Sequence, residues 1–177
     1  MIIQLTGLSG AGKTTLANGV KSMLEKHALK IEIIDGDAYR KTLCKDLGFS
    51  KEDRMENIRR LGKAAWSFKE LADIIIIAAI NPFSAIRNEL TKKYGTKTVF
   101  IKCDIPVLIK RDTKELYRRA LLPDDHPDKI FNLTGMNDTY EIPADPDLVI
   151  DTSRETTRQS VQKFYEFLLF SRASYIS

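Results

Sequence analysis

The stretch LTGLSGAGKTTLA, Leu5 to Ala17, decides the fold because it fits the spacing G-x-x-x-x-G-K-[ST] between an apolar run and an amphipathic segment. Glycines at this spacing permit a turn that directs several backbone N–H groups at one anion, at the start of a helix. We expect this turn to bind ATP through Gly7, Ser9, Gly10, Ala11, Gly12, Lys13, Thr14 and Thr15. Lys13 would reach the β- and γ-phosphates, and the Thr14 hydroxyl would bind Mg²⁺.

Apolar runs bounded by turn residues alternate with amphipathic segments along the whole chain. The runs predict five strands, at residues 2–5, 31–34, 74–78, 98–101 and 148–150. Apolar residues at three- and four-residue spacing predict helices at 13–26, 51–71, 84–93, 107–118 and 156–169. This alternation is typical of an α/β fold with a five-stranded parallel sheet and helices on both faces.

Length and composition limit the possible classes of protein. A chain of 177 residues with 43% hydrophobic residues predicts a single domain, 1–177. Its 28 basic and 24 acidic residues are interleaved, which favours a small anionic substrate over nucleic acid. Two distant cysteines form neither a disulfide framework nor a zinc site. With no apolar run of about 18 residues, we expect a cytoplasmic protein without a membrane partner.

The segment from Leu121 to Pro146 is rich in Pro, Asp, Asn and Gly and is long for a connection inside a compact domain. Such a segment is either a lid or disordered. Ile130, Phe131 and Leu133 give it apolar groups that can pack, and this favours a mobile lid. Including the preceding lysine, we place the lid at about residues 114–143.

The position of the acidic residues separates this chain from other proteins with such a phosphate-binding turn. A motor or switch protein carries an acid at the end of its buried strand, but 74–78 continues as AINP, and no guanine-binding N-K-x-D element is present. Instead Asp35 and Asp37 follow the second strand, at the carboxyl edge where open α/β folds bind ligands. We therefore predict a small-molecule kinase with Lys13, Asp35 and Asp37 as catalytic residues. Asp35 would bind Mg²⁺ with Thr14, and Asp37 would orient or deprotonate the acceptor hydroxyl.

A second group of residues has the chemistry of an acceptor site. Asp37 and Arg40 are three residues apart, so a short helix would place carboxylate and guanidinium on one face, which alone is typical of a surface pair. Downstream, LGFSKEDRMENIRRLG places Arg54 and Asn57 one helical turn apart, with Phe49 in the preceding turn. Guanidinium groups and an aromatic ring suit an acceptor with anionic groups and a flat base.

Motifs spread over nearly the whole chain resemble those of the adenylylsulfate kinase family. They are GLSGAGKTT, DGDAYR, LGFSKEDRMENIRR, RDTKELY and LTGMNDTYEIPADPDLVIDT, in this order. The third motif is far more diagnostic than the first. The resemblance implies a P-loop NTPase fold, a homodimer, and ATP- and Mg²⁺-dependent phosphorylation of the 3′-hydroxyl of adenosine 5′-phosphosulfate (adenylylsulfate), giving 3′-phosphoadenylylsulfate and ADP in sulfate assimilation.

The resemblance also implies which residues contact the acceptor. The predicted substrate-binding residues are Asp37, Arg40, Phe49, Arg54, Asn57, Ile80, Asn81, Lys114, Phe131 and Leu133. Lys114 corresponds to the family's lid lysine, and the Ile80 backbone would approach the same ligand.

Three departures from the family pattern lie on the acceptor side. Leu133 replaces a usual aromatic residue that stacks on adenine opposite Phe49, a role that Phe131 can take over. Asn81 replaces a frequent serine, and Ser84 replaces an arginine. Two alternatives therefore stay open. One is a related kinase acting on another modified nucleotide, for example a cytidine diphosphate derivative, and the other is a nucleotide-binding module without catalysis.

Overall fold

A computed structural model describes residues 1–176 of the chain and contains a five-stranded, fully parallel sheet of order β2-β3-β1-β4-β5. The strands are β1 (Ile2–Thr6), β2 (Ile31–Asp35), β3 (Ile74–Ala78), β4 (Lys97–Lys102) and β5 (Leu148–Asp151). All five coincide with the predicted strands apart from one or two residues at their ends. The predicted α/β class with a five-stranded parallel sheet is confirmed, and Ser177 lies outside the described residues.

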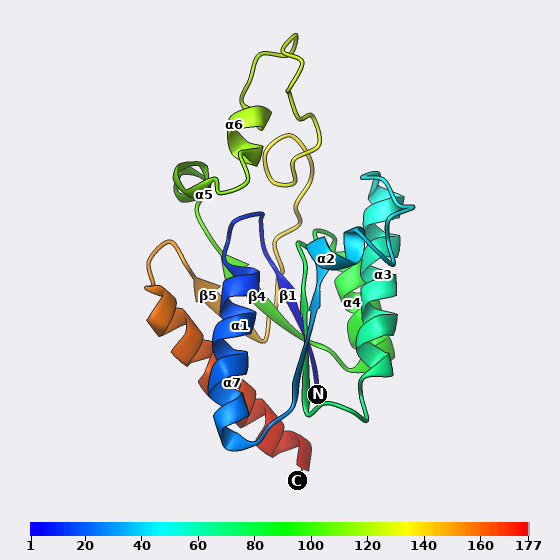
Figure 1. Ribbon diagram of the computed structural model, residues 1–177, viewed down its shortest axis with the longest axis vertical. Coiled ribbons are helices and arrows are strands. Elements are labelled where there is room, and N and C mark those ends of the chain that lie inside the picture. Colours follow the sequence, from blue (N-terminus) through cyan, green and yellow to red (C-terminus); the bar gives the residue numbers. More distant parts are fainter. Residues whose placement is uncertain (177) are drawn as a thin grey trace.

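Helices cover both faces of this sheet, as predicted (Figure 1). They are α1 (Lys13–Leu24) with the 3-10 turn η1 (Glu25–His27), α2 (Gly36–Arg40), α3 (Lys51–Ser67), α4 (Ser84–Tyr94), α5 (Ile105–Arg111), α6 (Leu116–Ala120) and α7 (Thr157–Ile176). Buried residues of α1 and α7 pack on one face, and those of α3 and α4 pack on the other. Helix α3 is shorter than predicted, and α7 is longer.

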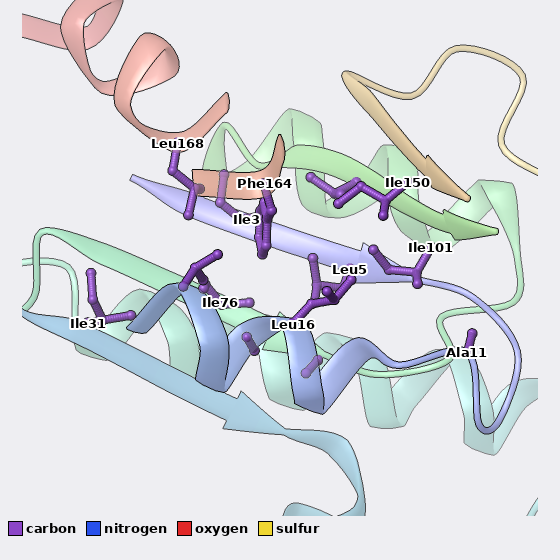
Figure 2. Packing of buried hydrophobic residues seen from close by; sticks show 14 of the residues in the cluster. Ile3, Leu5, Ala11, Leu16, Ile31, Ile76, Ile101, Ile150, Phe164 and Leu168 are labelled. Carbon is purple, nitrogen blue, oxygen red and sulfur yellow. The ribbon is translucent and has the colours of Figure 1, made fainter. Parts of the chain in front are cut away.

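The central strands explain why the sheet is buried on both sides. In β3 every residue is buried, and successive isoleucines alternate between the two cores: Ile74 and Ile76 face α1 and α7, while Ile75 and Ile77 face α3 and α4. Figure 2 shows the first of these cores, with Phe164 of α7 close to Ile3 of β1. The apolar run of β3 is therefore explained by two-sided burial.

The predicted helix at 107–118 is wrong, because the structure divides this segment into α5 and α6. The Asp112 carboxylate accepts hydrogen bonds from the backbone N–H groups of Tyr117, at 3.1 Å, and Arg118, at 2.8 Å. These bonds cap a new helix, because an aspartate side chain competes with the helical backbone pattern. The break turns Thr113 and Lys114 toward the carboxyl edge of the sheet.

The segment between α6 and β5 has little regular structure and extends beyond the carboxyl ends of the strands (Figure 1). Only an isolated bridge between Thr134 and Asp138 interrupts it. Leu133 is buried in the α1/α7 core, and Ile130 and Met136 pack against that core. This packing agrees with the apolar content that favoured a lid, and the lid's mobility stays a prediction. Within residues 1–176, no helix has both the length and the apolar character needed to cross a membrane.

Candidate active site

The phosphate-binding turn has the backbone that the glycine spacing predicts. Gly12 has φ 101° and directly precedes α1, in a conformation that side chains with a Cβ rarely adopt. At Gly7 a Cβ atom would lie 2.4 Å from the carbonyl oxygen of Ile101, so no larger residue fits there. The turn therefore brings backbone N–H groups to the N-terminus of α1, where a phosphate binds favourably.

A cavity of about 480 Å³ opens in front of this turn. Of the predicted residues, it is lined by Ser9, Gly10, Ala11, Gly12, Lys13, Thr14, Thr15, Asp37, Ile80 and Lys114. The phosphate-binding turn thus shares one cavity with residues predicted for the acceptor. The other predicted acceptor residues lie outside this cavity.

Lys13 lies in the phosphate-binding turn, where it is half-buried and lines the cavity. It donates hydrogen bonds of 2.8 Å to the carbonyl oxygens of Gly7 and Leu8. Burial lowers the pKa of Lys13 to about 8, with Lys114 lowering it further and with Asp37 and Asp35 opposing the shift. A bound polyphosphate would favour the charged form of this lysine.

Asp35 and Thr14 meet at the end of β2. The Thr14 hydroxyl donates to Oδ2 of Asp35 at 2.8 Å, while Oδ1 caps α2 by accepting from the N–H groups of Asp37 and Ala38. One carboxylate and one hydroxyl beside a phosphate-binding turn fit Mg²⁺, which proteins bind through few side chains plus phosphate oxygens and water. Residues 1–176 contain no cluster of three or more acidic, His or Cys side chains that could hold a metal without such phosphates.

Asp37 pairs with Lys114 rather than with Arg40, so the predicted carboxylate–guanidinium neighbours differ from those observed. The Lys114 ammonium group forms an ion pair with the Asp37 carboxylate at the cavity wall. Arg40 ends the short helix α2 and instead donates to the carbonyl oxygens of Leu47, at 3.1 Å, and Gly48, at 2.7 Å. The break between α5 and α6 thus supplies the partner of Asp37.

Phe49 presents an exposed ring with two guanidinium groups close to it. Its exposed fraction is 58%, and Arg40 and Arg54 lie 4.9 Å and 5.4 Å from its ring centroid. Ser50 caps α3 by accepting from the N–H of Asp53 at 3.1 Å, and so fixes the turn that carries Phe49. A flat base could stack on this ring while the guanidinium groups neutralise attached anions.

Arg54 joins α3 to the segment predicted as the lid. It is 8% exposed and donates to the Phe49 carbonyl at 2.9 Å, the Thr134 hydroxyl at 2.9 Å and the Asn132 carbonyl at 2.7 Å. It also forms an ion pair of 2.8 Å with Asp138. This residue therefore holds the lid segment against the predicted acceptor site, a role that sequence reasoning missed.

The remaining predicted acceptor residues differ in accessibility. Phe131 is exposed, at 60%, whereas Leu133 is buried in the core at 6%. Asn57 and Asn81 are also buried, and the Oδ1 atom of each has no hydrogen-bond partner in the described part of the chain. The Nδ2 atom of Asn81 donates to Gln4 at 2.9 Å. Of the two lid residues considered for stacking, only Phe131 is free to do so.

Several cavity residues escaped sequence reasoning, although some belong to the quoted motifs. They are Leu16, Ala78, Ala79, Arg111, Thr113, Thr152, Glu155, Thr157 and Ser160. Arg111 donates to the Thr152 carbonyl at 2.6 Å, which joins the end of α5 to the residue after β5. For Ala78, Ala79 and Thr152 the available signal was their position at or directly after the end of a strand, because ligands bind at that edge of parallel sheets.

With this geometry in view, the chain can be compared with known proteins. A family model described as adenylylsulphate kinase matches residues 1–151. An adenylyl-sulfate kinase of Bacillus pumilus is 41% identical over 170 residues, covering 94% of this chain and 84% of that protein. A probable bifunctional SAT/APS kinase 2 of Sorangium cellulosum is 44% identical over 92% of this chain, which spans 27% of that longer protein.

A solved structure gives a similar result for the fold. The APS kinase CysC of Mycobacterium tuberculosis, in complex with AMPPNP and APS, superimposes with a TM-score of 0.85 at 29% identity. The match covers 95% of this chain and 96% of that one. The predicted P-loop NTPase fold is confirmed by this likeness. Family model, relatives and structure agree, and the chain belongs to the adenylylsulphate kinase family.

Proposed function

We propose that the chain transfers the γ-phosphoryl group of ATP to the 3′-hydroxyl of adenosine 5′-phosphosulfate, giving 3′-phosphoadenylylsulfate and ADP for sulfate assimilation. The observation that carries this proposal is the shared cavity. It brings the phosphate-binding turn to the Asp37–Lys114 ion pair, where an acceptor hydroxyl would have to lie. Family membership supports the acceptor's identity.

The residues around the cavity have separate roles in phosphoryl transfer. The N–H groups of the turn and Lys13 hold the β- and γ-phosphates, and Thr14 and Asp35 would hold Mg²⁺, which neutralises phosphate charge. Asp37 orients the acceptor hydroxyl and takes its proton. A bond forms from that oxygen to the γ-phosphorus, the bond to the β,γ-bridging oxygen breaks, and ADP leaves with that oxygen. Lys114 neutralises charge on the moving group.

The acceptor would be held mainly outside the donor cavity. Phe49 and Phe131 stack on its adenine, while Arg40, Arg54 and Asn57 bind its sulfate and phosphate oxygens. The single domain, 1–177, uses residues from about 114 to 143 as a lid that excludes water, because an open site would hydrolyse ATP. We also expect a homodimer in the cytoplasm, and sedimentation of the purified chain tests the dimer.

An acceptor panel tests this function. ADP release is measured with adenosine 5′-phosphosulfate, adenosine 5′-monophosphate, a cytidine diphosphate derivative, and no acceptor. We expect turnover with adenosine 5′-phosphosulfate and at least about tenfold lower kcat/KM with the other two nucleotides, since one lacks the sulfate and the other lacks the adenine. Without acceptor, only background ADP release is expected. Turnover only with a non-adenine acceptor would refute the proposal in favour of a related kinase. ATP binding without any turnover would mean a nucleotide-binding module.

A further inference from the structure

Gln4 is a polar residue in the centre of the sheet, where an apolar side chain is expected. It is fully buried in β1 and lies on the same face as Ile2, toward α3 and α4. Its Nε2 atom has acceptors at the Arg87 carbonyl, at 3.1 Å, and at the hydroxyls of Thr91, Thr96 and Thr98, at 3.1, 2.8 and 3.0 Å. Its Oε1 atom accepts the Asn81 bond. Burying an amide costs free energy that its hydrogen bonds only offset. The presence of Gln4 at this position therefore needs an explanation other than stability.

Asn81 has a constrained backbone as well as a buried side chain. Its φ of 49° lies in the left-handed region, which asparagine tolerates better than most residues with a Cβ. Its carbonyl oxygen accepts from the Thr6 hydroxyl at 3.0 Å and from Nη1 of Arg87 at 2.8 Å. With 1% exposure, its side chain is directed at Gln4, and the adjacent cavity wall is formed by Ala79 and Ile80.

The loop that contains Asn81 supports two functional segments. The N–H of Gly7, the first glycine of the phosphate-binding turn, donates to the Ile80 carbonyl at 3.2 Å. At the far end of the predicted lid, the N–H of Glu141 donates to the Pro82 carbonyl at 2.9 Å. A change in the backbone at Asn81 would therefore move the cavity wall, the start of the turn and the lid attachment together.

We propose that Gln4 and Asn81 form a buried amide pair that positions the acceptor side of the cavity from the face of the sheet that α3 and α4 cover. Asn81 is then a positioning residue: it holds residues 80–82 in place through Gln4 and does not touch the acceptor. Gln4, more than 70 residues away in sequence and absent from the cavity lining, becomes a determinant of acceptor affinity. This inference rests on the proposed function and adds two residues to its positioning machinery.

Steady-state kinetics of Gln4→Leu, Asn81→Ala and the double variant test the pair. We expect each single variant to raise the KM for adenosine 5′-phosphosulfate about tenfold and to change the KM for ATP less than about twofold. The double variant should match the single variants, because both remove one shared interaction.

Thr98→Val is the matched control. It removes another hydroxyl partner of Gln4 and leaves the hydrogen bond between Gln4 and Asn81 in place. It should leave the acceptor KM unchanged. The proposal is overturned if Gln4→Leu leaves that KM unchanged, or if Thr98→Val raises it as much. It is also overturned if the double variant loses about a hundredfold, since independent effects multiply and Asn81 would then contact the acceptor directly.

Amide hydrogen exchange tests the Gln4–Asn81 pair without any acceptor, so its result does not depend on which acceptor the enzyme uses. Gln4→Leu and Asn81→Ala should each speed exchange of the Gly7 and Glu141 amides about tenfold without any ligand, because both amides bond to residues 80–82. Thr98→Val should not. Unchanged exchange in the first two variants refutes the pair. A wild type that is inactive on adenosine 5′-phosphosulfate, with the expected exchange pattern, refutes only the proposed function.

Discussion

Raising the pH should weaken ATP binding because Lys13 loses its charge. Burial lowers the pKa of this lysine to about 8 in the free protein. ATP binds the charged ammonium group and so raises its pKa, which means that binding takes up a proton when the free lysine is neutral. The contribution of Lys13 is therefore present below pH 8 and is lost progressively as the pH rises above it.

The size of the effect follows from the fraction of charged lysine. With a pKa of about 8, roughly 90% of the free protein is charged at pH 7 and about 9% at pH 9. The Kd for ATP should then rise about tenfold between these pH values, which is about 1.4 kcal/mol of binding free energy. Calorimetry at pH 8 in two buffers of different ionisation heat should show uptake of about half a proton.

Lys13→Arg is the control, because a guanidinium stays charged over the whole range. Its absolute affinity should fall, since a planar fork does not replace a compact ammonium group. Its Kd should nevertheless lack the rise between pH 7 and 9, and any slope left in this variant belongs to ATP itself. A wild-type Kd that follows the same pH curve as the arginine variant would refute the assignment of a depressed pKa to Lys13.

Two further predictions concern the acceptor side. Arg54→Ala should lower the free energy of unfolding by about 2–3 kcal/mol in urea titrations, since it removes the buried partner of Asp138, and should raise the acceptor KM at constant Kd for ATP. Arg59→Ala, which removes an exposed ion pair on the same helix, should change neither the free energy of unfolding nor the acceptor KM. If Arg54→Ala weakens the binding of ATP as much as that of the acceptor, the role of Arg54 is purely structural. Phe131→Ala should raise the acceptor KM about tenfold without destabilising the fold, whereas Leu133→Ala should lower the free energy of unfolding by about 2–3 kcal/mol. If Leu133→Ala raises the acceptor KM and Phe131→Ala instead lowers the stability in thermal melts, Leu133 and not Phe131 contacts the base.

Features with a local signature were predictable from the sequence. The strands and most helices follow from apolar periodicity, and the phosphate-binding turn follows from a spacing of glycines that few other backbones need. The break at Asp112 also has a local cause, yet the apolar pattern of 107–118 continues across it and hides the cap. Helix boundaries of this kind depend on whether a side chain or the helical backbone accepts the hydrogen bonds of the local N–H groups. The periodicity of apolar residues contains no information on this competition.

Contacts between distant residues left no such signature. Arg54 was predicted to face a ligand because a guanidinium suits an anion, and nothing in the sequence indicated that Asn132, Thr134 and Asp138 of the predicted lid would also be its partners. The pairing of Asn81 with Gln4 joins residues 77 positions apart. A single sequence contains no information on such pairs beyond the chemistry of each residue.

Two of the contacts between the predicted lid and the rest of the protein involve these distant residues. Near its middle the lid is held by Arg54, and at its far end Tyr140 contacts the Thr6 hydroxyl at 2.9 Å while Glu141 bonds to Pro82. Thr6 and Pro82 belong to the segments that carry the phosphate-binding turn and the cavity wall. An acceptor that engaged Arg54 would therefore compete with the contacts of Arg54 to the lid and leave those of Tyr140 and Glu141 intact. Because the contacts of Tyr140 and Glu141 are built on the loop that Gln4 and Asn81 hold, we expect this end of the lid to keep its position relative to the phosphate-binding turn when an acceptor binds at Arg54.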